Sequence, residues 1–246
     1  MYNILRNTII ILSISGVVSA CGDQAETQSP AQGQIDAYSK KRDDCKDGAE
    51  KSKKTSAEKP KEEKHIRNYG IEPDDIVYGN PEASVIFVVY TAPTCPHCVS
   101  YHKRTFPEIQ KKYIDTGKIA YVTREFVGSK QDLDASILAR CKGDQDSYTK
   151  FMHVILEQQE SWAYNKNYRE ILTNIGSIGG VSPEKYAACL QDKSIISTLM
   201  ENRALIVKEP RFIGTPSFFI NGKQYNGVYT LEDLSKAIDS ELPDGS

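Results

Sequence analysis

The sequence predicts an α/β fold in which a sheet is interrupted by a long helical insert. An apolar, β-branched run at 85–90 has the length of a strand and leads into a Cys-Pro-His-Cys motif at 95–98. A second such run at 217–220 is followed by Asn221-Gly222, the two-residue signal for a hairpin turn. Between these two parts, about 130–208 carries helical periodicity.

The elements before the insert follow from local signals. We expect a short first strand at 75–79 and a turn into the 85–90 strand. A helix should run from Cys95 to about residue 114, kinked at Pro107 because proline removes a backbone hydrogen bond and clashes with the preceding turn. A further strand is expected at 119–127.

Four or five helices are expected in the insert. Residues 133–141 and 148–158 show a 3.6-residue apolar period, and Ser182-Pro183 is an N-cap followed by a helix-starting proline. A last insert helix ends before residue 208, and a C-terminal helix is expected at 231–238. The order is therefore strand, helix, strand, insert, two strands and helix.

Length and charge limit the function. The chain has 246 residues with a formal net charge of −2, which argues against a nucleic-acid partner. We expect one folded domain at 68–246.

The N-terminal segment indicates export. Residues 1–20 have the apolar run and small-residue ending of a signal peptide, too short for a comfortable membrane span. Their ending, followed by Cys21, resembles a bacterial lipobox, which implies cleavage before Cys21 and lipidation of its thiol; an ordinary secretion signal is the alternative. Residues 21–67 are polar and highly charged, and we expect a disordered tether there because this composition cannot form a core.

Export also decides how the remaining cysteines are interpreted. Cys141 and Cys189 both lie in the helical insert, and a structural disulfide between them is the simplest interpretation in an oxidising compartment. Two buried free thiols are the alternative. Cys45 is left over in the polar stretch, where we expect a free thiol or an expendable residue, or a mixed disulfide with a partner.

The Cys-Pro-His-Cys motif has the arrangement of a redox centre. Two cysteines three apart at a helix start lie on the same side of its first turn and can form a disulfide with little rearrangement. Cys95 lies where the helix N-terminus favours a thiolate, and His97 adds a donor within reach of the same sulfur. Cys98, one turn inside, should be more buried and act as the resolving thiol.

The motif and a distant Thr215-Pro216 together resemble the thioredoxin superfamily, and Pro96-His97 with the long helical middle resembles its DsbA branch. The resemblance spans roughly 69–238 and implies a thioredoxin fold with an inserted helical domain at about 130–208. It also implies that Pro216 is cis and faces the active-site cysteines.

The resemblance implies a dithiol oxidase that introduces disulfides into reduced exported polypeptides. Its reoxidising partner would be a quinone-coupled membrane oxidase of the DsbB type. We expect a monomer with no cofactor beyond the cysteine pair, located in the periplasm of a Gram-negative-type bacterium and lipid-anchored to a membrane through Cys21.

Two departures from the family keep alternatives open. Relatives commonly carry a buried acid six residues before the first cysteine, where this chain has Val89, so the proton relay for Cys98 must use another group such as Glu125, or water. Thr215 precedes the proline, and threonine there is common in isomerases and reductases, so a disulfide isomerase or reductase is the alternative. Its hydroxyl could hydrogen-bond near the sulfurs and alter the potential.

Other function classes fit less well. Zinc needs two more ligands, and His102 and His153 show no paired spacing. A copper-delivery protein usually spaces its cysteines one residue further apart, with a distant histidine. A redox-inactive peptide-binding module would use the groove beside Pro216, but would not need the intact cysteine pair.

Overall fold

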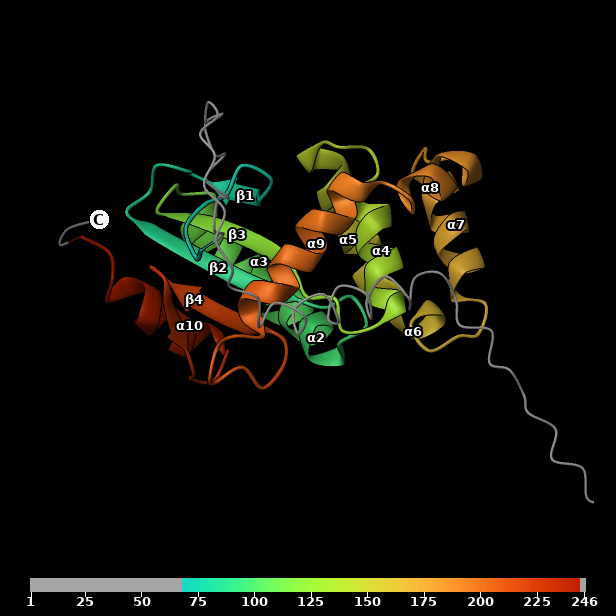
Figure 1. The fold of residues 1–246 in the computed structure, drawn as a ribbon. Coiled ribbons are helices and arrows are strands. Elements are labelled where there is room, and N and C mark those ends of the chain that lie inside the picture. Colours follow the sequence, from blue (N-terminus) through green and yellow to red (C-terminus); the bar gives the residue numbers. More distant parts are fainter. Residues whose placement is uncertain (1–67, 244–246) are drawn as a thin grey trace, which may run out of the picture. The chain divides into compact units, whose positions relative to one another are not determined.

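The computed structural model describes residues 68–243, in which a five-stranded mixed sheet supports the rest of the fold (Figure 1). The strands lie in the order β1-β3-β2-β4-β5. Strands β2 and β3 are parallel, and the other neighbouring pairs are antiparallel. The strands are β1 (Ile76–Gly79), β2 (Val85–Thr91), β3 (Ile119–Glu125), β4 (Ser217–Ile220) and β5 (Lys223–Tyr225).

The helices fall into two groups. Those beside the sheet are α2 (Pro96–Arg104), α3 (Phe106–Ile109) and α10 (Leu231–Asp239), and a π-helical turn (Gln110–Ile114) follows α3. Those between β3 and β4 are α4 (Lys130–Arg140), α5 (Gln145–Glu157), α6 (Gln159–Trp162), α7 (Tyr168–Ile178), α8 (Pro183–Cys189) and α9 (Lys193–Ile206). In Figure 1 the helices α4–α8 gather at one side of the sheet, and α9 returns the chain across it.

The prediction of one kinked helix from Cys95 to about residue 114 is wrong, because the structure has separate helices there. The structure breaks it at Thr105, two residues before Pro107, into α2 and the short α3. A proline fits the first turn of a helix, where no intrahelical partner is needed for its nitrogen, so Pro107 starts a new helix instead of kinking the old one. The chain then ends in the π-helical turn and at Gly117, which has a positive φ of 68°.

The insert helices begin at side-chain caps. Ser182 accepts a hydrogen bond from the Lys185 backbone N–H, so the expected cap-and-proline start of α8 is present. Ser129 and Asp144 cap α4 and α5 in the same way. The sequence analysis did not locate α7, because its N-cap residue, Asn167, makes no side-chain capping hydrogen bond and so gives no clear start signal.

Three apolar clusters hold these layers together. One lies between the sheet and the helices α2, α3 and α10, and includes Phe87 and Phe218. The opposite face of the sheet packs Tyr90 and Phe219 against Ile206 of α9. The largest cluster fills the helical insert, so the insert has its own core.

The insert also contains the disulfide expected from the sequence. Cys141 and Cys189 are joined, with an S–S distance of 1.98 Å across a sequence separation of 48. The hairpin at Asn221-Gly222 is present too, with positive φ angles of 47° and 79° that suit these residue types.

The expected signal peptide at 1–20, lipidation of Cys21, the tether at 21–67 and the odd Cys45 lie outside the described residues. Within 68–243, no helix has both the length and the apolar character needed to cross a bilayer.

Candidate active site

The first cysteine lies at the end of the turn that connects β2 to α2. Cys95 is the N-cap residue of α2, with extended backbone angles, and Pro96 follows at the first helical position. The Cys95 backbone N–H donates to the Ala92 carbonyl at 3.0 Å, which closes the turn between strand and helix. The sulfur is therefore held at the helix N-terminus, and both active-site cysteines are free thiols in the structure.

Several donors converge on the Cys95 sulfur. They lower its pKa to about 5, the largest cause being the hydrogen bond from the Cys98 thiol. The side chain of Thr215 and the backbone N–H groups of His97 and Cys98 act in the same direction, while partial burial opposes them. Cys95 is thus a thiolate at neutral pH.

The second thiol has the opposite character. Cys98 is 1% exposed, and burial, followed by the hydrogen bond to Cys95 and its charge, raises the pKa of Cys98 well above its ordinary value. Its sulfur accepts a hydrogen bond from the Ala92 backbone N–H at 3.4 Å. The pair therefore combines a half-buried thiol of low pKa with a buried, protonated partner.

His97 contributes differently from the sequence expectation. Its backbone N–H supports the Cys95 thiolate, whereas its ring Nδ1 lies 3.3 Å from the Tyr229 hydroxyl. Tyr229 was not anticipated from the sequence, since it comes from the loop before α10 and lies 132 residues from His97.

Thr215 and Pro216 lie opposite the cysteines. The bond between them is cis, and the Cys95 sulfur lies 3.1 Å from the Thr215 carbonyl oxygen, to which it donates when it is protonated. Pro216 precedes β4, whose first residue, Ser217, pairs with Tyr90 at the end of β2. The antiparallel pairing of β4 with β2 thus carries this dipeptide to the end of the sheet where the Cys95 turn begins.

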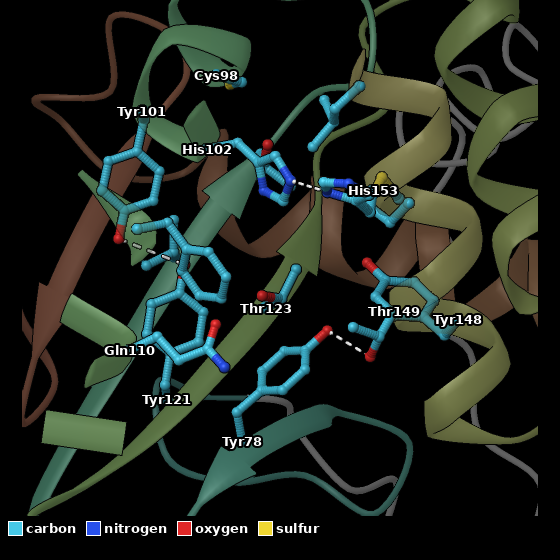
Figure 2. A pocket seen from close by; sticks show the side chains of 15 residues that line it. Tyr78, Cys98, Tyr101, His102, Gln110, Tyr121, Thr123, Tyr148, Thr149 and His153 are labelled. Atoms are coloured by element: carbon cyan, nitrogen blue, oxygen red, sulfur yellow. Dashed lines mark hydrogen bonds between the residues drawn. The ribbon is translucent and has the colours of Figure 1, made fainter. Parts of the chain in front are cut away.

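A cavity of about 180 Å³ lies beneath Cys98 (Figure 2). Threonine hydroxyls of both central strands line it, together with tyrosines and a pair of histidines. The His102 Nε2 and His153 Nδ1 atoms are 3.0 Å apart, and Figure 2 shows the two rings pointing toward one another from α2 and α5. No sequence spacing indicated this pair, because its members are 51 residues apart.

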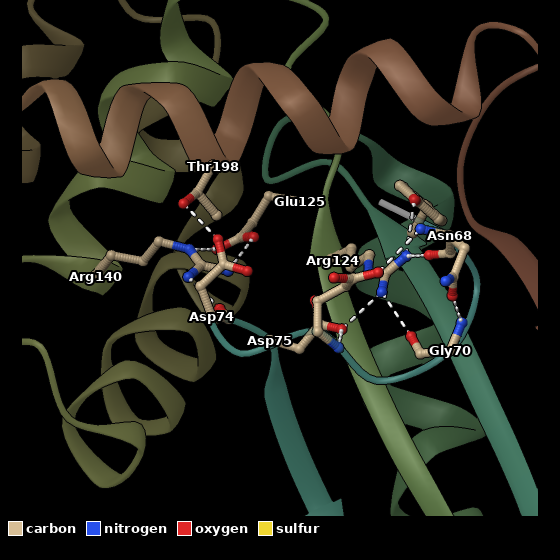
Figure 3. A network of polar contacts seen from close by, with 10 residues as sticks. Asn68, Gly70, Asp74, Asp75, Arg124, Glu125, Arg140 and Thr198 are labelled. Atoms are coloured by element: carbon tan, nitrogen blue, oxygen red, sulfur yellow. Dashed lines mark hydrogen bonds and ion pairs between the residues drawn. The ribbon is translucent and has the colours of Figure 1, made fainter. Parts of the chain in front are cut away.

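Neither Val89, at the position where relatives carry a buried acid, nor Glu125, the alternative proton carrier, is free to relay a proton. Val89 is buried in the core. Both carboxylate oxygens of Glu125 accept hydrogen bonds from Arg140, at 2.6 and 2.8 Å (Figure 3). Because Arg140 belongs to α4 and Glu125 ends β3, this pair ties the insert to the sheet.

A second buried ion pair anchors the beginning of the described chain. Arg124 donates to both carboxylate oxygens of Asp75 and to the carbonyls of Asn68 and Gly70 (Figure 3). Among the described residues, no group of three or more His, Cys, Asp or Glu side chains is placed to hold a metal ion.

The geometry agrees with comparisons to known proteins. The family model described as Thioredoxin matches residues 71–240. The chain belongs to the thioredoxin family. Within this family its α/β fold with an inserted helical domain is confirmed, since a solved structure, alpha-DsbA1 of Wolbachia pipientis, matches with a TM-score of 0.63 and 28% identity. That match covers 69% of this chain and 92% of the Wolbachia protein.

Two curated relatives of this thioredoxin-family chain carry names that refer to disulfides. A Rickettsia prowazekii protein named "Putative protein-disulfide oxidoreductase" is 54% identical over 176 residues, covering 72% of this chain and 64% of that protein. The chain thus spans slightly less than two thirds of that relative. Disulfide bond formation protein D of Bacillus subtilis is 26% identical over 170 residues, covering 68% of this chain and 76% of the relative.

Proposed function

We propose that this chain is a thiol:disulfide oxidoreductase, acting as a dithiol oxidase that introduces disulfides into exported polypeptides. The observation that carries the proposal is the opposite displacement of the two thiol pKa values, down at Cys95 and up at Cys98. Stabilising the Cys95 thiolate stabilises the reduced enzyme, which makes its disulfide a stronger electron acceptor.

The exchange proceeds in two balanced steps. A substrate thiolate attacks the Cys95 sulfur of the enzyme disulfide, forming a mixed disulfide, and Cys98 departs as a thiolate that takes up one proton. A second thiolate of the substrate then attacks the substrate sulfur that is bonded to Cys95 in the mixed disulfide. The substrate disulfide forms, and Cys95 leaves as a thiolate that needs no proton at neutral pH. Two electrons pass from the substrate dithiol to the enzyme, with no cofactor required.

The surroundings of Cys95 suit an extended, partly apolar polypeptide. A groove of about 420 Å³ runs past Thr215 and is lined by residues of β5 and the loop before α10. The large apolar side chains that are exposed among the described residues include Ile213, Tyr164 and Val228, with relative exposures of 101%, 72% and 64%. Ile213 lines the groove, and the Tyr164 hydroxyl donates to the Thr94 carbonyl beside Cys95 at 3.0 Å. A substrate strand would pair with the Thr215 backbone and bury this apolar surface.

Location and partner belong to the same proposal. An N-terminal segment with a signal peptide and a lipidated Cys21 would place the domain in the periplasm, tethered to a membrane. Reduced exported polypeptides would be its substrates there. A DsbB-type membrane oxidase would withdraw the two electrons.

Disulfide isomerisation is the second candidate, and Thr215 favours it. Threonine before the cis-proline is common in isomerases and reductases of the superfamily that the chain resembles. The Thr215 side chain does contact both sulfurs, where it lowers the pKa of each.

Equilibration with glutathione tests the choice. We expect a potential closer to the about −120 mV of DsbA than to the about −270 mV of thioredoxin. Oxidation of a reduced two-cysteine peptide should outpace repair of a scrambled one. Cys98→Ser should trap the mixed disulfide through Cys95, and Cys95→Ser serves as the inactive control. A potential near that of thioredoxin would refute the oxidase role, and faster repair than oxidation would favour the isomerase.

A further inference from the structure

Cys98 must gain and lose a proton at a buried sulfur. When the enzyme disulfide opens, Cys98 leaves as a thiolate whose pKa lies well above its ordinary value, so it takes up a proton. When the disulfide closes again, the Cys98 thiol must give up that proton before its sulfur attacks. The side chain is 1% exposed, so direct contact with bulk water does not serve this transfer.

Neither position considered from the sequence supplies a free acid. Val89 has no titratable group, and Glu125 has both oxygens engaged by Arg140. Thr91, which hydrogen-bonds Cys98, has a hydroxyl that passes protons but does not hold a charge. A proton carrier must therefore come from elsewhere in the cavity.

His102 has the right place. It follows Cys98 by four residues, so both side chains lie on the same face of α2, and both line the cavity of about 180 Å³. Its Nε2 atom meets His153 Nδ1 at 3.0 Å, and His153 is exposed on α5. Both rings line the space beneath the buried sulfur, and Figure 2 shows them side by side, so the exposed His153 connects this space through His102 with solvent.

The cavity has room and partners for water. At about 30 Å³ per molecule its volume accommodates roughly six waters. The hydroxyls of Thr91 and Thr123 line it from the two central strands. The Tyr148 hydroxyl also lines it and is buried without a hydrogen-bond partner among the described residues, which suits a group that bonds to water.

The charges around His102 favour a neutral ring. Burial, and then the charge of His153, lowers the pKa of His102 to about 4, with Lys103 acting in the same direction and Glu157 opposing them. Lys103 and Glu157 also pair with each other at 3.2 Å. Burial raises the pKa of the cavity tyrosines, Tyr78 to about 12 and Tyr101, Tyr121 and Tyr148 further, so they stay protonated. A neutral imidazole accepts a proton at one nitrogen and donates one from the other.

We propose that His102 and His153 form a proton relay that supplies and removes the Cys98 proton through water in the cavity beneath α2. This proposal rests on the proposed redox function of the Cys95–Cys98 pair. On disulfide opening, one proton passes from solvent through His153 and His102 to the Cys98 thiolate. On closure the same proton returns by the same route as the Cys98 sulfur attacks Cys95 and the partner thiolate leaves.

Single-turnover oxidation by glutathione disulfide tests the relay without any protein substrate. Cys95 of the reduced protein first forms a mixed disulfide with glutathione, and Cys98 then closes the ring. The decay of the mixed disulfide, followed by acid quenching and mass spectrometry, gives the closure rate. The variants are His102→Gln and His153→Gln, with Arg104→Gln, a change at an exposed cation on the same helical turn, as the control.

We expect closure at neutral pH to slow by about tenfold or more in His102→Gln, and by less in His153→Gln, where water can replace an exposed ring. The equilibrium constant with glutathione and the thiolate absorbance of Cys95 should stay at wild-type values, because a relay changes rates and not equilibria. Added imidazole should restore part of the rate in His153→Gln. The Arg104→Gln control should close at the wild-type rate.

Wild-type closure rates in both histidine variants would overturn the relay, as would rate and equilibrium constants that shift together. If His102→Gln does not fold, a His153→Gln variant with the wild-type rate and no response to imidazole overturns it equally. A wild-type protein that exchanges no disulfide with glutathione would instead overturn the proposed function, and the relay with it.

Discussion

The pKa of Cys95 is low because several groups that stabilise negative charge point at its sulfur. The Cys98 thiol, the Thr215 side chain and two backbone N–H groups at the start of α2 all stabilise negative charge there. A helix N-terminus alone favours a thiolate, and the added donors strengthen the effect. Partial burial works against them but does not prevail.

The first prediction concerns the titration of this thiol. Ultraviolet thiolate absorbance of the reduced protein should rise with a midpoint near pH 5, the pKa to which Cys95 is lowered. A Cys95→Ser variant should lose that transition, and Cys98→Ser should shift it upward because the largest stabilising hydrogen bond is weakened. A wild-type midpoint near the ordinary value of 9.0 would contradict the structure.

The second prediction concerns Thr215. Replacing it with valine keeps the side-chain shape but removes the hydroxyl that lowers the pKa of Cys95. The Cys95 pKa should rise by about one unit, and the potential should become more negative by about 30 mV, as expected for one lost hydrogen bond to a charged group. Thiolate titration and glutathione equilibration measure the two shifts, and a serine variant that retains the hydroxyl is the control. Unchanged values in Thr215→Val would reduce Thr215 to a shape-filling residue.

At the scale of elements, the helical insert is joined to the sheet by a buried ion pair. Arg140 of α4 and Glu125 of β3 have side-chain exposures of 10% and 0%. A buried pair of this kind adds little over an apolar pair, but removing one partner leaves an uncompensated buried charge.

Arg140→Met should therefore lower the free energy of unfolding by about 3 to 5 kcal/mol, measured by urea denaturation. Combining it with Glu125→Gln should recover part of that loss, since no charge then remains unpaired. Lys150→Met removes a cation from the exposed pair with Asp146 and should leave stability unchanged. An Arg140→Met protein as stable as wild type would contradict this role.

The disulfide between α8 and the end of α4 stabilises the insert itself. It closes a loop across 48 positions, so losing it should cost about 2 to 5 kcal/mol of stability. The double variant Cys141→Ala/Cys189→Ala tests this by denaturation. Its active-site potential should change less than that of a variant in Pro96-His97, because the bond lies within the insert. If the potential of the double variant changed more than that of the Pro96-His97 variants, the insert would control the redox centre.

At the scale of the whole molecule, the redox state and the stability of the fold are linked. The Cys95 pKa is about 5 in the folded protein against an ordinary value of 9.0, so its thiolate stabilises the reduced fold. Because the folded pKa is the lower one, this stabilisation is fully present above pH 9 and is lost as pH falls through 5. Cys98 has a raised pKa, so its contribution is complete below pH 9 and adds no slope in this window.

The free energy of unfolding of the reduced protein should therefore fall relative to that of the oxidised protein as pH decreases from 9 to 5. Denaturation of both forms across this range gives the difference, in which other titrating groups cancel. A reduced Cys95→Ala protein should lack the slope. A difference that stays constant, or grows toward low pH, would contradict the linkage.

Much of the fold was predictable because its signals are local. The apolar run of β2, the Ser182-Pro183 start of α8 and the Asn221-Gly222 turn each depend on backbone preferences of a few consecutive residues. The prediction placed the break of the first helix at Pro107 instead of Thr105, and it missed α7. Neither feature has a strong signal in its own segment. The signal peptide, the lipidated Cys21 and the tether stay predictions.

By itself the sequence determined the cysteine pair at the start of a helix and the family, because this pair is a short motif with its own chemistry; the roles of nucleophile and resolving thiol stay predictions. Only the tertiary structure decided what surrounds that pair. The sheet brings Thr215 next to Cys95, 120 positions away in the sequence. Helices α2 and α5 bring His102 next to His153, 51 positions away, and Arg140 pairs with Glu125. Such contacts depend on how separate elements pack, and no local pattern specifies them.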